Sequence, residues 1–159
     1  SKIGENIILK RLKLIKADTN IKIFTYTHNS YRKNIGKICV ALKSEVQSLS
    51  DDVVDLGKNL CMHIAALKPL SLDINNLDKK LIEKEKEIQF ANIKSSGKPD
   101  NIVDKILEGK MKKFYSEVTF FNQEYILENN KTIRKVIKEF SLNKSKFNVT
   151  DFSFFVLGS

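Results

Sequence analysis

The stretch IKIFTYTHNSYRKNIGKICVAL, residues 21–42, decides the fold class of this chain. Across residues 21–28, β-branched side chains at odd positions alternate with lysine, aromatic and histidine side chains at even positions, which is typical of a strand. Residues 35–42 form a second and more continuously apolar run, and the polar residues 29–34 separate the two runs. The stretch therefore predicts an antiparallel hairpin with a loop of medium length.

Each end of the chain offers this hairpin one further strand. Residues 6–16 are β-like but irregular, because their apolar positions shift from odd numbers, as at Ile7, to even numbers, as at Leu12. A β-bulge produces such a shift, and we expect a strand there. The last run, residues 149–157, alternates regularly and carries on one side Phe152, Phe154 and Val156. We expect this last strand to pair with an edge of the hairpin.

After the hairpin, from Ser50, the apolar period changes to that of a helix. The apolar stripe recurs at three- and four-residue steps and consists of Val53, Leu56, Leu60, Ile64 and Leu67. Ser50 suits the N-cap position, and the two aspartates that follow it suit the positive end of the helix dipole. Pro69 predicts the end of this helix, because proline cannot donate the helical hydrogen bond.

The predicted helix contains one of the two cysteines and one of the two histidines, in the segment CMHIAALKP at residues 61–69. Positions 61 and 63 point about 200° apart on a helix, so Cys61 and His63 cannot share one metal ion or one proton. We expect the two side chains at opposite edges of the apolar stripe, with His63 as a half-buried packing residue. Neither Cys39 nor Cys61 lies in a disulfide or metal-binding pattern, which favours a reduced, cytoplasmic protein.

Residues 74–121 are predicted to form two antiparallel helices joined by a short turn. The first helix follows a heptad pattern, with apolar a and d positions at Ile74, Leu77, Leu81, Ile88 and Ala91. In the turn, Gly97 suits a left-handed helix end, and Pro99 suits the start of the next helix. The second helix carries one apolar face, made of Val103, Leu107, Phe114, Val118 and Phe121. Nothing in this pattern indicates catalysis, so we expect a structural or oligomerisation element.

These elements together predict an α+β fold. A small antiparallel sheet of about three strands would be packed by helices, and a helical hairpin would project from it. Residues 1–73 would supply the strand-rich half with its packing helix, and residues 74–121 the hairpin. Residues 122–159 would add a closing helix and the last strand to the same domain as residues 1–73.

The composition excludes several classes of protein. With 159 residues and 42% apolar content, the chain can bury a core without disulfides or metal ions. Its apolar runs are far shorter than the ~20 residues of a membrane span. The net charge of +9 comes mostly from lysine, which favours a solvated surface over specific binding of nucleic acid. Phosphate-binding, metalloprotease and hydrolase motifs are lacking, and we expect neither a bond-making enzyme nor a cofactor.

Residues 62–69 also match the pattern M-H-[IV]-A-A-x-x-P. Six other short motifs accompany it in order: K-I-G-E-N at 2–6, Y-T-H at 26–28, G-K-I at 36–38, E-K-E at 83–85, S-G-K-P at 96–99 and E-G-K-M-K-K-F at 108–114. In these motifs the chain resembles the core and dimerisation region of the bacterial elongation factor Ts family. The resemblance covers nearly the whole chain.

The resemblance implies a factor that binds elongation factor Tu and promotes the release of GDP. Such a factor needs no catalytic side chain, because it binds the nucleotide-free partner more tightly than the loaded one. The positions that match the family's partner contacts are Ile3, Tyr26, His28, Tyr125 and Ile126. The resemblance also implies a cytoplasmic protein without a cofactor, a metal or a membrane span.

The chain departs from the family's pattern at several places. Glu124 stands where the family usually has a proline, and Ser153 stands where its closing strand usually has an arginine. In the family, the helical module that carries a T-D-[FV] element lies upstream of K-I-G-E-N, and many members have a short C-terminal helix; we expect both to be missing from this sequence. We therefore expect a core fragment that binds elongation factor Tu, and the sequence leaves open whether it releases nucleotide alone.

Two functions of other classes are the alternatives. One is a basic module that binds RNA or the ribosome, for which affinity would fall with salt according to the number of phosphates neutralised. The other is a purely structural dimerisation domain, since a heptad face left uncovered would pair with a second copy. A homodimer and binding to elongation factor Tu are compatible with each other.

Overall fold

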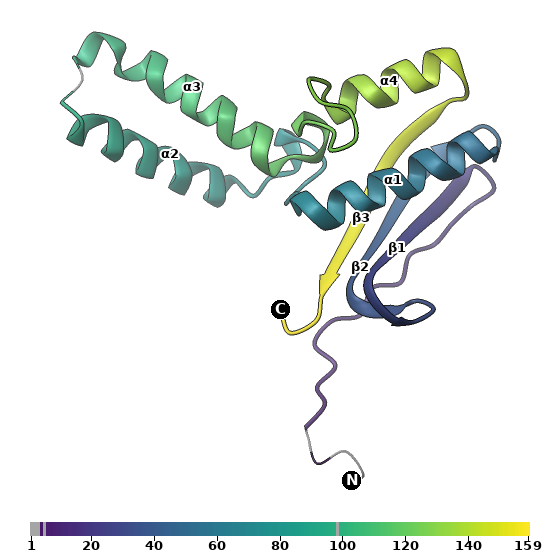
Figure 1. Ribbon diagram of the computed structural model, residues 1–159. Helices are drawn as coiled ribbons and strands as arrows, with labels where there is room; N and C mark the ends of the chain where they lie inside the picture. The colour runs from purple at the N-terminus through teal and green to yellow at the C-terminus, as the bar shows by residue number, and fades with distance from the viewer. Residues whose placement is uncertain (1–3, 5, 98) are drawn as a thin grey trace.

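A three-stranded antiparallel sheet and four α-helices make up the computed structural model, which describes Gly4, residues 6–97 and residues 99–159. In chain order the elements are β1 (Ile21–Arg32), β2 (Ile35–Val46), α1 (Asp51–Leu67), η1 (Ile74–Asn76), α2 (Lys79–Ser95), α3 (Asp100–Val118), η2 (Phe120–Asn122), α4 (Ile133–Asn143) and β3 (Phe147–Val156) (Figure 1). The two η elements are single 3₁₀ turns. The α+β fold class predicted from the sequence is confirmed.

The sheet has the strand order β1–β2–β3, so the last strand pairs with the hairpin as expected. Its register aligns Phe24, Leu42 and Phe152 across the three strands, and all three side chains belong to the core. Strand β1 extends beyond the first apolar run to Arg32, whereas β2 begins at Ile35 as the second run does, so the expected medium loop is a tight turn. Polar residues can continue a ladder there because the pairing is made by backbone groups.

Helix α1 packs across one face of the sheet (Figure 1). The side chain of Ser50 accepts a hydrogen bond from the backbone N–H of Val53, which confirms the predicted N-cap. Gly57 lets the helix approach β1 closely, because a Cβ atom there would lie 2.3 Å from the ring of Phe24. The helix ends at Leu67, before Pro69, as predicted.

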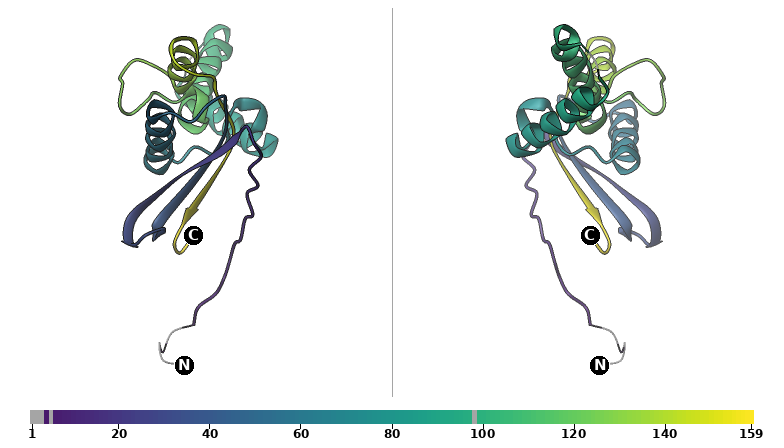
Figure 2. Two further views of the ribbon diagram at one scale, coloured as in Figure 1. Left: turned by 90° about the vertical axis from the view of Figure 1, so that its right-hand side faces the viewer. Right: turned by 90° about the vertical axis from the view of Figure 1, so that its left-hand side faces the viewer.

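The predicted strand at residues 6–16 is absent from the described part of the chain. Gly4 and residues 6–18 are irregular, and Leu12 is 87% exposed. The segment lies on the sheet face opposite α1 (Figure 2), where Lys13 Nζ is 2.9 Å from Asp151 Oδ2 and the Arg11 guanidinium lies over the ring of Phe155. The prediction was wrong because an alternating pattern reports side chains that suit a pleated surface, whereas a strand also needs a neighbouring edge to pair with.

Helices α2 and α3 form the predicted antiparallel hairpin and project from the rest of the molecule (Figure 1). Gly97 has a left-handed φ of +67° at the end of α2, as its position in the turn predicted. The hairpin has a small buried cluster of its own, which consists of Ile93, Val103, Leu107 and Met111. It is thus a second packed unit beside the sheet.

The heptad face predicted for α2 is displaced by one residue. Ile88 is 45% exposed and Ala91 is exposed, whereas Ile82 and Ile93 pack against α3. Adjacent apolar residues at positions 81 and 82 offer two stripes about 100° apart on a helix. The sequence pattern could not choose between them, because the choice depends on the facing residues of α3.

Candidate partner-binding site

Two of the predicted contact residues lie together on β1, an edge strand of the sheet. Tyr26 is half-buried and packs against the core, whereas His28, two residues further on, is exposed. The Tyr26 hydroxyl lies 3.1 Å from His28 Nδ1, and the two ring centroids are 6.1 Å apart. The anchored phenol therefore holds an exposed imidazole near the β1–β2 turn.

The other two described contact residues lie in the loop between η2 and α4. This loop is tied at its neck, because Tyr125 N donates to Lys131 O at 2.8 Å and Ile133 N donates to Gln123 O at 3.0 Å. A bridge between Glu124 and Thr132 lies in the same neck. The backbone pairing thus gives the loop a defined shape although Glu124 stands in place of a proline.

Within this loop, Tyr125 and Ile126 point to different environments. Tyr125 is only 6% exposed, and its ring lies 6.0 Å from that of His63. Burial raises the pKa of the Tyr125 hydroxyl, and a hydrogen bond with Asn59 partly offsets this. Ile126 is 39% exposed and the next residue, Leu127, is 57% exposed. The loop therefore uses Tyr125 as an anchor and presents Ile126 to solvent.

The structure does not bring all the predicted contact residues together. In Figure 1 the β1–β2 turn lies on one side of α1 and the loop between η2 and α4 lies on the other. Tyr26 and His28 lie on β1, and Ile126 lies in the loop between η2 and α4. Ile3, the fifth predicted residue, lies outside the described residues.

The histidine and cysteine of α1 are both fully buried. Half-burial was expected for His63, and that prediction was wrong because the loop at Tyr125 and the turn at Phe120 cover its outer side. Burial lowers the pKa of His63, against the opposing effect of a hydrogen bond with Gln123. Burial also raises the pKa of Cys61 to about 12, so its thiol stays protonated and unreactive at neutral pH.

Gln123 is a buried polar residue that the sequence analysis did not single out. Its side chain is 2% exposed and lies 3.0 Å from His63, measured from Oε1 to Nε2. The amide nitrogen donates to Glu117 O at 2.7 Å and to Leu67 O at 3.4 Å. A single glutamine between Asn122 and Glu124 carries no periodic signal, so only the folded arrangement reveals this role.

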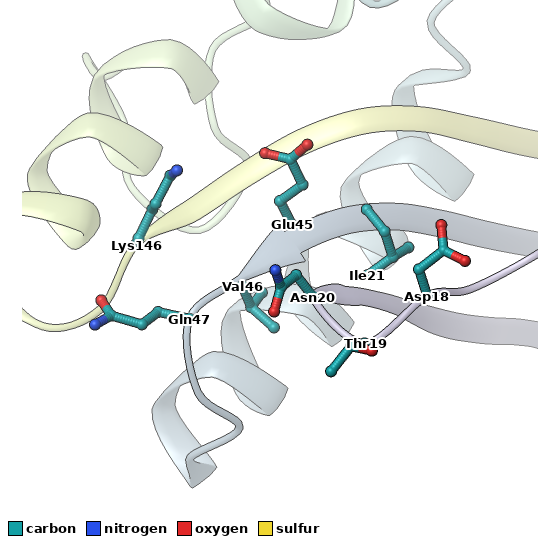
Figure 3. Close-up of a pocket in the computed structure, with 8 residues that line it drawn as sticks. All are labelled: Asp18, Thr19, Asn20, Ile21, Glu45, Val46, Gln47 and Lys146. Atoms are coloured by element: carbon teal, nitrogen blue, oxygen red, sulfur yellow. The ribbon is translucent and has the colours of Figure 1, made fainter.

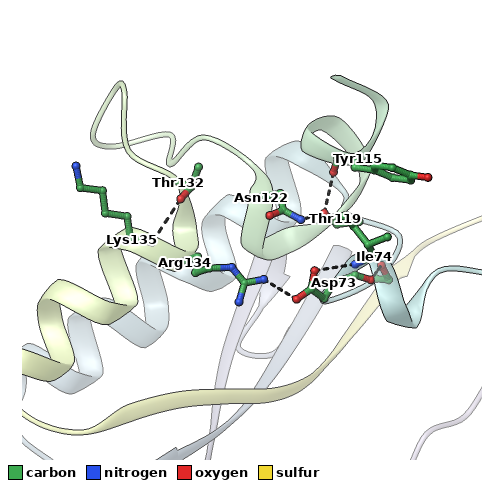
Figure 4. Close-up of polar contacts among 9 residues, drawn as sticks. Asp73, Ile74, Tyr115, Thr119, Asn122, Thr132, Arg134 and Lys135 are labelled. Atoms are coloured by element: carbon green, nitrogen blue, oxygen red, sulfur yellow. Dashed lines mark hydrogen bonds and ion pairs between the residues drawn. The ribbon is translucent and has the colours of Figure 1, made fainter. Parts of the chain in front are cut away.

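A polar cluster joins the base of the helical hairpin to α4, as Figure 4 shows. The carboxylate of Asp73 accepts hydrogen bonds from the backbone N–H of Ile74 at 2.8 Å and from the guanidinium of Arg134. Partial burial opposes ionisation, but these donors together hold the pKa of Asp73 below its usual value. Arg134 also lies over the ring of Phe121 at 4.9 Å. The cluster therefore fixes the hairpin base to the closing helix.

An open hollow of about 680 Å³ lies at the end of the sheet where β1 begins and β2 ends (Figure 3). Its lining residues are Asp18, Thr19, Asn20, Ile21, Glu45, Val46, Gln47 and Lys146. This lining contains no histidine or cysteine, so it offers no pairing of a nucleophile with an imidazole base.

The residues that the structure describes contain neither a metal-binding cluster nor a membrane-spanning helix. Within that part of the chain, histidine, cysteine and acidic side chains do not gather in groups of three that could hold a metal ion. None of its helices is both long enough and apolar enough to span a membrane.

Comparison with known proteins extends the similarity over the full sequence. Residues 1–159 match the family described as elongation factor TS. The chain is 34% identical over 137 residues to elongation factor Ts of Gluconobacter oxydans, covering 86% of this chain and 45% of that protein. It is 35% identical over 158 residues to elongation factor Ts of Rickettsia prowazekii, covering 98% of this chain and 51% of that protein.

The same relationship holds for a third relative. Elongation factor Ts of Orientia tsutsugamushi is 36% identical over 152 residues, which cover 95% of this chain and 49% of that protein. The chain thus spans about half the length of the curated relatives that it matches. Because the family match covers every residue, the chain belongs to the elongation factor Ts family, whose members are translation elongation factors.

Proposed function

We propose that this chain binds elongation factor Tu and promotes release of GDP by stabilising the nucleotide-free form of that partner. The observation that carries the proposal is the exposed Ile126 on a loop held at its neck, in a chain of the elongation factor Ts family. An apolar side chain on a preorganised loop suits a protein contact, because little conformational entropy is lost on binding.

The proposed mechanism requires only differential binding. If the chain binds nucleotide-free elongation factor Tu more tightly than the GDP-bound form, linkage requires that GDP and the chain weaken each other's binding. Release of GDP then becomes faster without any proton transfer or covalent step. We therefore propose an exchange factor that acts through a protein surface rather than a bond-making enzyme.

The contact surface proposed here has two parts. Ile126 supplies an apolar contact from the loop after η2, and His28 with Tyr26 supplies a polar contact from the end of β1. Tyr125, the residue before Ile126, anchors the loop, because its side chain is buried against His63. Contacts from two separate elements, β1 and the loop after η2, suit a large protein partner better than a small ligand.

The experiment that tests this function measures release of a fluorescent GDP analogue from cognate elongation factor Tu, with and without the chain. A direct binding titration with nucleotide-free elongation factor Tu accompanies it. We expect binding and faster release. Binding without acceleration would confine the function to docking, and the absence of binding would refute the proposal.

Matched variants locate the contact. Ile126→Ala and His28→Ala should each weaken binding while leaving thermal stability nearly unchanged, because both side chains are exposed. Leu142→Ala is the control, since Leu142 is 76% exposed near the end of α4, whereas the loop with Ile126 precedes the start of that helix. Equal weakening by the control would show that the titration reports general surface changes rather than this contact.

The two other functional classes give distinct results in the same preparation. An RNA-binding module would bind RNA with an affinity that falls steeply as salt is raised. A dimerisation domain would show a concentration-dependent mass in sedimentation experiments. We propose elongation factor Tu as the principal partner, and a homodimer would add to that role without replacing it.

A further inference from the structure

A series of hydrogen bonds runs from the exposed loop after η2 to the base of the helical hairpin. It begins at the backbone N–H of Ile126, which lies 3.4 Å from His63 Nδ1. It continues from His63 Nε2 to Gln123 Oε1 over 3.0 Å, and from Gln123 Nε2 to Glu117 O over 2.7 Å. These contacts connect the loop after η2, α1 and the end of α3.

The direction of each hydrogen bond follows from the two ends of this series, which are backbone carbonyls at one end and a backbone N–H at the other. Gln123 Nε2 faces the carbonyl oxygens of Glu117 and Leu67 and must donate to them, so Gln123 Oε1 is the acceptor that faces His63. His63 Nε2 therefore carries the proton, and Nδ1 has a lone pair for the Ile126 N–H. The network assigns one tautomer to the imidazole.

The surroundings of His63 keep this arrangement in place. The imidazole is fully buried, with the rings of Phe120 at 5.9 Å and Tyr125 at 6.0 Å. A buried imidazole cannot replace a lost partner with bulk water, so each of its two hydrogen bonds is costly to break. The ring orientation is thus coupled to the position of the Ile126 backbone.

We propose that His63 and Gln123 are positioning residues, which hold the Ile126 loop in the conformation that contacts the protein partner. This inference rests on the proposed binding of elongation factor Tu through Ile126. Neither side chain touches the partner, because both are buried. They act by fixing the backbone of the residue that does.

Two substitutions separate the two nitrogen atoms of His63. In His63→Asn, the side-chain oxygen can take the place of Nδ1 and accept the Ile126 N–H, while the link to Gln123 is lost. In His63→Gln, the amide nitrogen can take the place of Nε2 and donate to Gln123, while the acceptor for Ile126 is lost. Both variants remove the ring from the core, so they are matched for lost packing.

We expect His63→Gln to weaken binding of elongation factor Tu by about two- to tenfold, the effect of one lost hydrogen bond. His63→Asn should stay close to the wild type in affinity, although urea denaturation should show a similar loss of stability in both variants. In an Ile126→Ala background, His63→Gln should have no further effect on affinity. This last result separates a positioning role from a general loss of stability.

Other results would overturn the proposal. Equal weakening by His63→Asn and His63→Gln, in step with their loss of stability, would assign His63 to packing alone. An undiminished effect of His63→Gln in the Ile126→Ala background would show that it does not act through Ile126. No binding by the wild-type chain would instead refute the proposed function, and the positioning role in binding with it.

Amide hydrogen exchange on the free wild-type chain tests the geometry without any variant. The Ile126 amide should exchange at least about tenfold more slowly than the amide of its exposed neighbour Leu127, because its N–H is bonded inside the fold. Equal exchange rates at the two positions would overturn the proposal even if both His63 variants failed to fold. The measurement is also independent of elongation factor Tu.

Discussion

The sheet with α1 and α4 covers its apolar residues far more completely than the helical hairpin does. The first region has side chains from all three strands in one buried cluster, and Leu42, Leu60 and Ile133 are fully buried in it. The hairpin buries one small cluster, and its outer surface leaves Ile88 45% and Phe90 42% exposed. The difference indicates that the first region carries the stability of the fold and that the hairpin opens more readily.

The largest expected effect is a loss of stability after a cavity is made in the first region. Leu60→Ala should lower the free energy of unfolding by about 2–5 kcal/mol, since Leu60 is fully buried and its neighbours cannot all collapse into the space. Urea denaturation followed by circular dichroism measures this. The exposed Leu142→Ala serves as the control, with an expected change within about 0.5 kcal/mol. Similar losses in both variants would contradict the packing described for α1.

A cavity in the hairpin should have a smaller and more local effect. Leu107→Ala should lower the opening free energy of α2 and α3 amides by about 2 kcal/mol, the lower end for a leucine cavity, because the side chain is 7% exposed within a small cluster. Hydrogen exchange measures this residue by residue. Amides of β2 should keep their protection, and an equal loss there would show that the two regions unfold as one unit.

The stability of the first region should also depend on the protonation of His63. Burial lowers the pKa of His63 in the folded chain below the ordinary histidine value of 6.5. Below pH 6.5 the unfolded chain therefore binds a proton at His63 more readily than the folded chain does. The contribution of His63 is therefore fully present above this pH and is lost as the pH falls toward the folded-state pKa. The loss should reach at most about 1.4 kcal/mol per pH unit.

The pH effect is measured as a difference between two proteins. Urea denaturation of the wild type and of His63→Asn between pH 7.5 and 5 cancels the titration of carboxylates common to both. A wild-type chain that lost no more stability than the variant over this range would contradict the buried, uncharged state of His63. The backbone amides of α2 and α3 should follow the same pH dependence only if Gln123 couples the helical hairpin to the sheet region.

The smallest expected effect concerns the exposed ion pair at the junction. Arg134→Ala should lower the free energy of unfolding by less than about 1 kcal/mol, because Arg134 is 54% exposed and solvent screens its attraction to Asp73. Calorimetry measures the change, and Lys113→Ala, in the more exposed pair with Glu117, is the control. A loss of several kcal/mol would show that the junction, rather than the sheet region, limits the stability of the fold.

Local pattern predicted the elements that depend on contacts near in sequence. The strands of the hairpin, the N-cap at Ser50, the stop before Pro69 and the turn at Gly97 were all confirmed. Each rests on alternation, helical period or a backbone preference that a few adjacent residues express. The family resemblance was likewise confirmed, because its motifs are short and occur in order.

Predictions that depended on a distant partner were less reliable. The strand expected at residues 6–16 has a suitable pattern but pairs with no strand among the described residues. The stripe of α2 that faces α3 was displaced by one position, since two adjacent apolar residues satisfy the period equally well. The burial of Tyr125 and of His63 depends on the way the loop after η2 returns to α1.

The sequence by itself determined the fold class and the family, because these follow from local pattern and short motifs. Only the tertiary structure decided that Gln123, from a stretch without a periodic signal, meets His63 across 60 residues of chain. The physical reason is that a buried polar pair forms only where a hydrogen-bond donor and an acceptor from distant parts of the chain meet in the folded structure. No periodicity in the chain records that pairing, and it exists only when α1, α3 and the loop are packed together.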